Sequence, residues 1–294
     1  MNRKTSTLFA AGAAIVAASA VSSGVGAASR PAAQPWTIGL TSNRDSRDAE
    51  IYAVRSDGTG VRRLTRSPFF DGFPVWSPDR KKIAFYSQRS AKGDVWVMNA
   101  DGSAPRNLTR SLAHDSLGSW SPDGRRIAFD SDRAGGGIYL MNADGSGQRS
   151  VPGTGADDVN PQWSPDGKTI LFATRRDGND ELYAINPDGS EPRNLTNDPG
   201  RDGDGGFVWS PNGRRIAFTT RRDGNAEVYV MNADGTGQTR VTRSKEDEAL
   251  LSWSPDGRRI AFQRWPSTPR WAFFVMNADG SAVKKVTWSL PKSR

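Results

Sequence analysis

Cysteine is absent from this chain of 294 residues, and histidine occurs only once, at His114. The lack of cysteine excludes disulfides, thiolate metal sites and attachment of a lipid to a cysteine. A single histidine is too few for a histidine-rich metal site, and no Gly-x-Ser-x-Gly sequence supplies a serine nucleophile. The run His114-Asp115-Ser116 is not a nucleophile set, because consecutive loop residues do not face each other. We therefore expect no catalytic residues, no cofactor and no metal, with His114 as a solvated loop residue.

Long apolar stretches are missing beyond the first 28 residues. Arg3 and Lys4 precede an uncharged stretch from Leu8 to about Val21, and small residues follow at Val25-Gly26-Ala27. This order predicts a secretory signal peptide over residues 1–27. An uncleaved anchor is the alternative, but the stretch is mostly Ala, Gly and Ser. We expect a periplasmic or extracellular protein, monomeric and without a membrane span after cleavage.

The chain carries a formal charge of +8, and loss of Arg3 and Lys4 with the leader leaves +6. Paired cations such as Lys81-Lys82 and Arg125-Arg126 recur along the chain and suggest a surface for polyanions. Acids of the adjacent turns offset them, and no interleaved exposed aromatics accompany them. We therefore do not expect a nucleic-acid partner.

A pentapeptide, Trp-Ser-Pro-Asp-Gly or a near copy, repeats at an almost fixed interval. Its copies begin at Trp76, Trp120, Trp163, Trp209 and Trp253, with steps of 44, 43, 46 and 44 residues. Asp-Gly pairs repeat independently with nearly the same period, at Asp57, Asp101, Asp144, Asp188, Asp234 and Asp279. Such a period indicates six copies of one supersecondary unit.

Each unit contains four short segments rich in strand formers, separated by Pro-Asp-Gly and Ala-Asp-Gly turns. A four-stranded antiparallel unit of this length is a propeller blade, so we predict an all-β, six-bladed β-propeller over residues 36–294. The Trp residues then pack between blades. Ile38 aligns with Ile83 of a second strand, so the first blade is incomplete unless the short segment 28–35 supplies its innermost strand.

Two sets of charged residues share the repeat register. An acid stands five residues before each repeated Trp, and an Arg follows the predicted second strand. The acids are Asp71, Asp115, Asp158, Asp204 and Glu248; the arginines are Arg44, Arg89, Arg133, Arg176 and Arg222. Both sets belong to one mouth of the propeller channel. Either they pair as a structural buttress, or they leave a negative funnel that binds a cation or a basic segment of a partner.

The repeat W-S-P-D-G-x-x-I-A-F…R-D-G-N…Y-V-M-N-A-D-G resembles that of the TolB-like propeller family. Arg176-Asp177-Gly178-Asn179 and Arg222-Asp223-Gly224-Asn225 carry the resemblance most closely, and it extends from about Trp36 to Thr287. It implies an envelope protein that binds a protein or peptide partner, with a Pal-type lipoprotein as precedent, over the channel mouth. TolB itself has an α/β domain before its propeller. Here only about eight residues separate the predicted cleavage site from the first strand, which favours a free-standing propeller.

The repeat also resembles the propellers of prolyl oligopeptidase-type peptidases and oligogalacturonide lyases, so a carbohydrate-binding or lyase-like propeller is the alternative. That alternative needs exposed aromatics, and the candidates are Phe69, Phe70, Phe73, Trp265 and Trp271. A weak calcium site is a further alternative at Asp198, Asp202 and Asp204, in the loop Asn197–Gly206.

Overall fold

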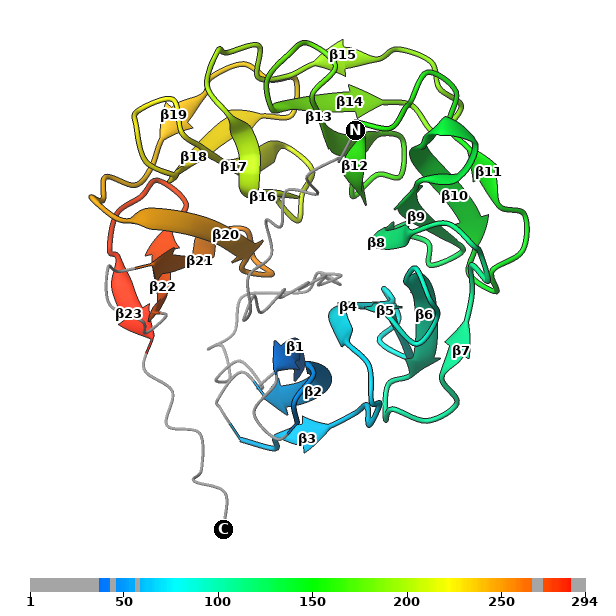
Figure 1. Cartoon of the computed structure of the whole chain (residues 1–294). Coiled ribbons are helices and arrows are strands. Elements are labelled where there is room, and N and C mark those ends of the chain that lie inside the picture. Colours follow the sequence, from blue (N-terminus) through cyan, green and yellow to red (C-terminus); the bar gives the residue numbers. More distant parts are fainter. Residues whose placement is uncertain (1–36, 43–45, 56–58, 266–271, 287–294) are drawn as a thin grey trace, which may run out of the picture.

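The computed structural model describes residues 37–42, 46–55, 59–265 and 272–286, which form six antiparallel sheets arranged in a ring (Figure 1). This confirms the predicted all-β, six-bladed propeller. Among the described residues, no helix is long and apolar enough to cross a membrane. The predicted signal peptide 1–27 and the segment 28–35 lie outside the described residues.

The first blade has three strands and the other five have four. Blade one contains β1 (Thr37–Ser42), β2 (Glu50–Arg55) and β3 (Arg62–Arg63), and blade two contains β4 (Asp71–Trp76), β5 (Lys82–Ser87), β6 (Asp94–Asn99) and β7 (Arg106–Asn107). Blade three contains β8 (Asp115–Trp120), β9 (Arg126–Ser131), β10 (Gly137–Asn142) and β11 (Arg149–Ser150), with a 3-10 turn over Arg133–Gly135. Blade four contains β12 (Val159–Trp163), β13 (Ile170–Thr174), β14 (Glu181–Ile185) and β15 (Arg193–Asn194). Blade five contains β16 (Asp202–Trp209), β17 (Arg215–Thr220), β18 (Glu227–Asn232) and β19 (Thr239–Arg240), and blade six contains β20 (Asp247–Trp253), β21 (Arg259–Trp265), β22 (Ala272–Asn277) and β23 (Lys284–Val286).

The first strand of each four-stranded blade lies nearest the centre of the ring, and the fourth lies at its rim (Figure 1). Because neighbouring strands are antiparallel, the connections emerge alternately on two faces. We call the face with the second-to-third and fourth-to-first connections the loop face, and the opposite face the turn face. In blade one, β1 pairs with β2 as second strands pair with third strands elsewhere, so its described part lacks a first strand, as the repeat register predicted.

The core consists of five apolar clusters, one at each junction between consecutive blades. The second strands are buried on both faces, because each lies between two blades, and this explains the continuous Ile-Ala-Phe runs. Every repeated Trp is buried against the preceding blade, and Trp120 Nε1 donates to the Val75 carbonyl at 3.1 Å. The predicted packing role of these Trp residues is confirmed.

The repeated pentapeptide forms the tight turn between the first two strands. Its Ser hydroxyl donates to the Asp carboxylate two residues later, at 2.6 Å for Ser121 and Asp123. The following Gly has a positive φ, 69° at Gly124, which glycine adopts without a steric penalty. In blade two Arg80 occupies this position with φ 62°.

Candidate functional site

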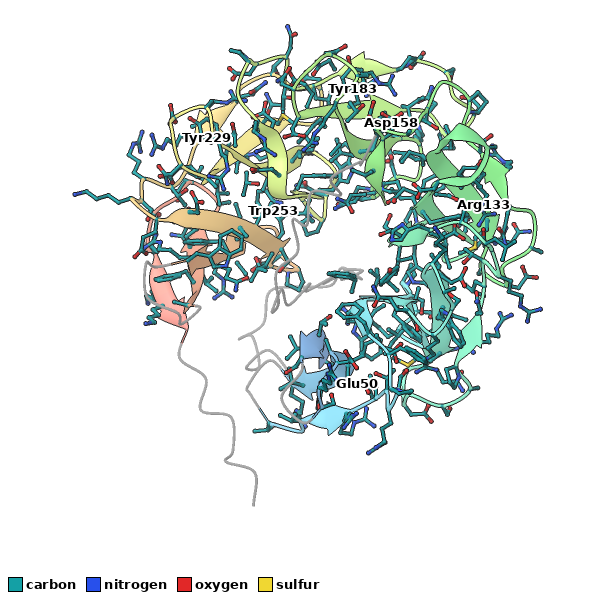
Figure 2. The ribbon with its side chains drawn as sticks, in the orientation of Figure 1. Glu50, Arg133, Asp158, Tyr183, Tyr229 and Trp253 are labelled. Carbon is teal, nitrogen blue, oxygen red and sulfur yellow. The ribbon has the colours of Figure 1, made fainter. Side chains whose placement is uncertain are left out.

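The predicted acids lie at the loop face and pair with arginines of their own blades. The ion pairs join Asp71 to Arg89, Asp115 to Arg133 and Asp158 to Arg176, each at 2.6 Å between nitrogen and oxygen. Figure 2 labels Arg133 on blade three and Asp158 on blade four. All three acids are buried. Their carboxylates therefore face arginines within the blade.

In blade five the acid of this set is Asp202, so the prediction of Asp204 was wrong in register. Strand β16 has eight residues, and its pairing with β17 shifts between Asp202 and Phe207, which places Asp202 opposite Thr220. Asp202 pairs with the predicted Arg222 at 3.0 Å, while Asp204 pairs with Arg221 at 2.8 Å. Counting back from Trp could not detect these extra residues.

In blade six Glu248 pairs with Arg264 at 2.7 Å, an arginine that the sequence pattern did not include. Arg264 stands directly opposite Glu248 in the sheet, at the position that Ser87 occupies opposite Asp71. The sequence prediction assumed one fixed position for the arginine in every repeat. It missed Arg264 because this arginine stands two residues earlier in its repeat than the arginines of blades two to five. Arg44, the predicted member in blade one, lies outside the described residues.

Each arginine of these pairs also lies over aromatic rings of its own blade. The guanidinium carbon is 4.5 to 5.9 Å from the centres of two rings, one on the second strand and one on the third. Stacking of this kind contributes about 0.5–2 kcal/mol. Burial raises the pKa of Asp71, Asp202 and Glu248 although their arginines oppose the shift. This geometry favours the buttress over the funnel.

A second set of buried acids, which sequence reasoning missed, begins the third strand of four blades. Each acid accepts a hydrogen bond from a Thr hydroxyl that follows the fourth strand of the same blade, and the Thr oxygen accepts the backbone N–H of the residue after the acid. The pairs are Glu50 with Thr65, Asp94 with Thr109, Glu181 with Thr196 and Glu227 with Thr242. The signal was available, because the two residues of every pair are 15 positions apart. These acids fasten the fourth strand to the third.

Ion pairs between blades are concentrated in blades four to six. Asp180 pairs with Arg175 and with Arg201 of the connection to blade five. Arg221 joins Asp204 of its own blade to Asp247 of blade six, at 2.8 and 2.9 Å.

The residues of the suggested calcium site belong to this ion-pair network. Asp198, Asp202 and Asp204 each lie within 4 Å of an arginine nitrogen. No group of three or more His, Cys, Asp or Glu in the described ranges could hold a metal ion. The arginines already supply the positive charge that calcium would bring.

Blade two and the connections on either side of it contain an aromatic cluster, where blades four to six have ion pairs. Ring centres are 5.7 Å apart for Phe70 and Phe73, 6.0 Å for Phe70 and Tyr86, and 5.5 Å for Tyr86 and His114. His114 Nε2 lies 3.3 Å from the Tyr86 hydroxyl. His114 is therefore packed against Tyr86, in contrast to the solvated residue that we expected.

Large apolar side chains are exposed mainly on the loop face. In the described part of the chain, the exposed ones are Phe69 at 50%, Leu112 at 96%, Val159 at 37%, Trp265 at 38% and Val283 at 45% of their surface. The first four belong to connections or strand ends of the loop face, and Val283 belongs to the turn face. Trp271, another predicted aromatic candidate, lies outside the described residues.

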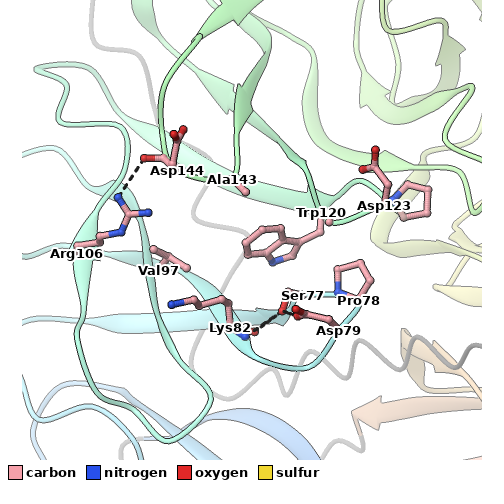
Figure 3. Close-up of a pocket in the computed structure, with 12 residues that line it drawn as sticks. Ser77, Pro78, Asp79, Lys82, Val97, Arg106, Trp120, Asp123, Ala143 and Asp144 are labelled. Atoms are coloured by element: carbon pink, nitrogen blue, oxygen red, sulfur yellow. Dashed lines mark hydrogen bonds between the residues drawn. The ribbon is translucent and has the colours of Figure 1, made fainter.

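A pocket of about 540 Å³ opens between blades two and three on the turn face (Figure 3). Its lining includes Trp120, Val97 and Pro122, and charged residues of both signs. Two of the polar groups are already bonded: Lys82 donates to Asn99 at 2.6 Å, and Arg106 donates to the Asp144 carbonyl at 3.1 Å. The pocket is remote from both sets of loop-face acids.

A family model described as the TolB beta propeller domain matches residues 72–202 and 204–293, which is more than half of the chain. A comparison with curated proteins finds no match.

Among the solved structures similar to this chain, three illustrate the range. A putative TolB from Agrobacterium tumefaciens is 24% identical, with a TM-score of 0.67 over 77% of this chain and 83% of that one. TolB from Acinetobacter baumannii is 22% identical, with a TM-score of 0.68 over 79% of this chain and 58% of that one. A puromycin-hydrolyzing peptidase from Mycobacterium tuberculosis is 14% identical, with a TM-score of 0.66 over 87% of this chain and 44% of that one. At these identities the likeness shows the fold alone.

Proposed function

The chain belongs to the TolB β-propeller family, and from this premise we propose that it is a non-enzymatic binding module for a protein or peptide partner. We further propose that it acts outside the cytoplasm, as a component of the cell envelope. The partner docks on the loop face, and by family resemblance a Pal-type lipoprotein is the model for it.

The observation that carries this proposal is the distribution of exposed apolar residues. Of the large apolar side chains that are exposed in the described ranges, Phe69, Leu112, Val159 and Trp265 lie on the loop face and Val283 lies on the turn face. Interfaces between proteins are enriched in such side chains at their centres. The acids nearby are buried and paired with arginines, so the partner contacts apolar and peripheral groups of this face rather than the acid ring.

The side-chain geometry favours binding over catalysis. Asp115 is buried and paired with Arg133, and His114 is packed against Tyr86, so these neighbours do not act on one another. Among the described residues, the exposed aromatics are Phe69 and Trp265, which belong to the regions of blades two and six and do not form one platform of the kind on which sugars stack.

The absence of cysteine allows a direct test of the binding face. The variants Val283→Cys and Val159→Cys are attached to a solid support through the introduced thiol, which covers the turn face and the loop face respectively. Both are incubated with an envelope extract, with excess soluble wild-type protein as competitor. We expect competable capture of a partner by the Val283→Cys form and its loss in the Val159→Cys form. Equal capture by both forms would contradict the loop face, and no capture by either would contradict the binding function.

A further inference from the structure

The loop face is built differently on its two halves. In blades four to six, Arg201, Arg221 and their carboxylate partners connect neighbouring blades through ion pairs. In the described part of blades one to three, every ion pair that involves the loop-face acids stays within its own blade. Gln88 and Asp132 occupy the positions of Arg175, which shares Asp180 with Arg201, and of Arg221, which joins blades five and six. In the described residues of the first half, these two positions therefore form no ion pair between blades.

The two most exposed of the large apolar side chains in the described ranges belong to this first half, in connections that also supply residues of the aromatic cluster. Phe69 precedes Phe70, and Leu112 stands two residues before His114. The rings of Phe70, Tyr86 and His114 are in contact in that order. The cluster therefore fixes the two connections that display Phe69 and Leu112, which lowers the entropy cost of binding at them.

Phe73, in the same cluster, has a backbone conformation that is unfavourable for a bulky residue. Its φ is 55°, in the left-handed region that costs a bulky side chain about 1–3 kcal/mol. The residues three before the repeated Trp in blades four and five are Asn160, φ 56°, and Gly206, φ 113°, types that suit this conformation. The strained backbone at Phe73 places its aromatic ring in the cluster. Backbone strain of this kind is found most often at functional sites.

Exposed charge in this region is positive. Arg66, Lys92 and Arg110 are exposed and make no ion pair with any described residue. The nearby acids Asp71 and Asp94 are buried and satisfied by Arg89, Asn107 and Thr109. Among the described residues of this region, the exposed acids are Asp48 and Asp132 at its edges, and each is next to an arginine in the sequence.

We propose that the blade-two patch, consisting of Arg66, Phe69, Lys92, Arg110 and Leu112, binds an acidic segment of the partner that inserts bulky apolar side chains. The inference rests on the proposed function and specifies the chemistry of its partner. Its cations would meet the carboxylates, and Phe69 and Leu112 would meet the apolar side chains. Three cations are fewer than the four to eight that mark a site for anionic lipids, which favours a peptide.

Selection from a random peptide library displayed on phage tests this proposal without assuming a sequence. The Val283→Cys form is immobilised through its thiol for the selection, and the selected peptides are synthesised and titrated in solution against the wild-type protein and its variants. We expect them to be rich in Asp, Glu and bulky apolar residues. Binding should weaken about tenfold or more for Phe69→Ser/Leu112→Ser and for Arg66→Glu/Arg110→Glu. Val283→Ser removes an apolar residue of similar exposure from the turn face and should leave binding unchanged.

The alternative outcomes are distinguishable. Selected peptides that bind both double variants as tightly as wild type would overturn the patch but leave a binding function on another part of the protein. Basic peptides would overturn its chemistry. Failure to select any peptide, together with failure to capture a partner from the extract, would overturn both proposals. Binding to vesicles of anionic phospholipid that is lost in Arg66→Glu/Arg110→Glu, without peptide selection, would replace the peptide by a membrane. Unchanged melting temperatures show that the exposed substitutions leave the fold intact.

Discussion

At the scale of single residues, the acids that suggested a binding funnel have the surroundings of structural groups. Asp71 is buried. Its carboxylate accepts hydrogen bonds from two nitrogens of Arg89 and a hydrogen bond of 2.6 Å from the Ser87 hydroxyl. Arg89 in turn lies 5.0 Å from the centre of the Trp96 ring. A carboxylate held in this way gains little from an external cation, because its hydrogen-bonding capacity is already used.

Arg89→Met tests this role, because it leaves the buried Asp71 carboxylate without its cation. Breaking a buried pair in this way should lower the free energy of unfolding by about 3 kcal/mol. Urea denaturation provides the measurement, and Arg125→Met, at an exposed position of the turn face, provides the control. The double variant Asp71→Asn/Arg89→Met should recover part of the loss. If Arg89→Met were as stable as Arg125→Met, the buttress would have no energetic basis.

Asp130 on β9 gives stability a pH dependence of a known sign. Its Oδ1 accepts the Asn160 N–H of blade four at 3.0 Å, and burial raises its pKa to about 7, with Asp132 and Asp115 adding to the shift. An unfolded Asp has a pKa near 3.9, so between about pH 4 and 7 the folded chain holds a proton that the unfolded chain has lost. This group therefore makes the protein less stable as the pH rises through that window.

Asp130→Asn should remove this pH-dependent contribution to stability while keeping an acceptor for the Asn160 N–H. We expect the variant to exceed wild type in unfolding free energy at about pH 8, by about 1–2 kcal/mol, and to match it near pH 4. This expected difference in unfolding free energy is smaller than the whole pKa shift would give, because part of the Asp130 side chain contacts solvent. Urea titrations at several pH values measure the difference. A constant difference across the range would contradict burial as the cause.

At the scale of strands and turns, the sequence was sufficient where each residue pattern has one structural meaning. Ile-Ala-Phe runs and Asp-Gly turns predicted the strand order, and the missing first strand followed from the alignment of Ile38 with Ile83. The offset rule failed at Asp204, because a strand irregularity shifts side chains without changing the turn that follows. It failed again at Arg264, because a guanidinium can reach the same carboxylate from different backbone positions.

The Thr hydroxyl that fastens the third and fourth strands offers a test at this scale. In Thr109→Val, Asp94 loses the hydroxyl donor at 2.7 Å, and the Val95 N–H loses its acceptor at 3.1 Å. Because both groups are buried, we expect a loss of about 1–3 kcal/mol in unfolding free energy. Thr239→Val, at an exposed position of β19, is the matched control. Equal stability of the two variants would show that the acid and Thr pairs do not hold the strands.

At the scale of the whole molecule, near-identical repeats produce a face with two different halves. Blades four to six connect their loops by ion pairs, and blades one to three expose apolar and cationic side chains over an aromatic cluster. The sequence placed Phe69, Phe70 and Phe73 together, but which of them is exposed depends on packing between blades. A pattern shared by all blades cannot reveal a site that arises from the differences among them.

The central claim is that a partner binds the loop face over the blade-two patch. Replacement of Leu112 by the photoreactive residue p-benzoylphenylalanine tests it directly, with Val283 replaced in the same way as the control on the turn face. Both forms are irradiated in envelope extract and examined by mass spectrometry. We predict a discrete protein adduct at position 112, reduced by Arg66→Glu/Arg110→Glu, and none at position 283. An adduct only at position 283, or the same adduct at both positions, would contradict the account.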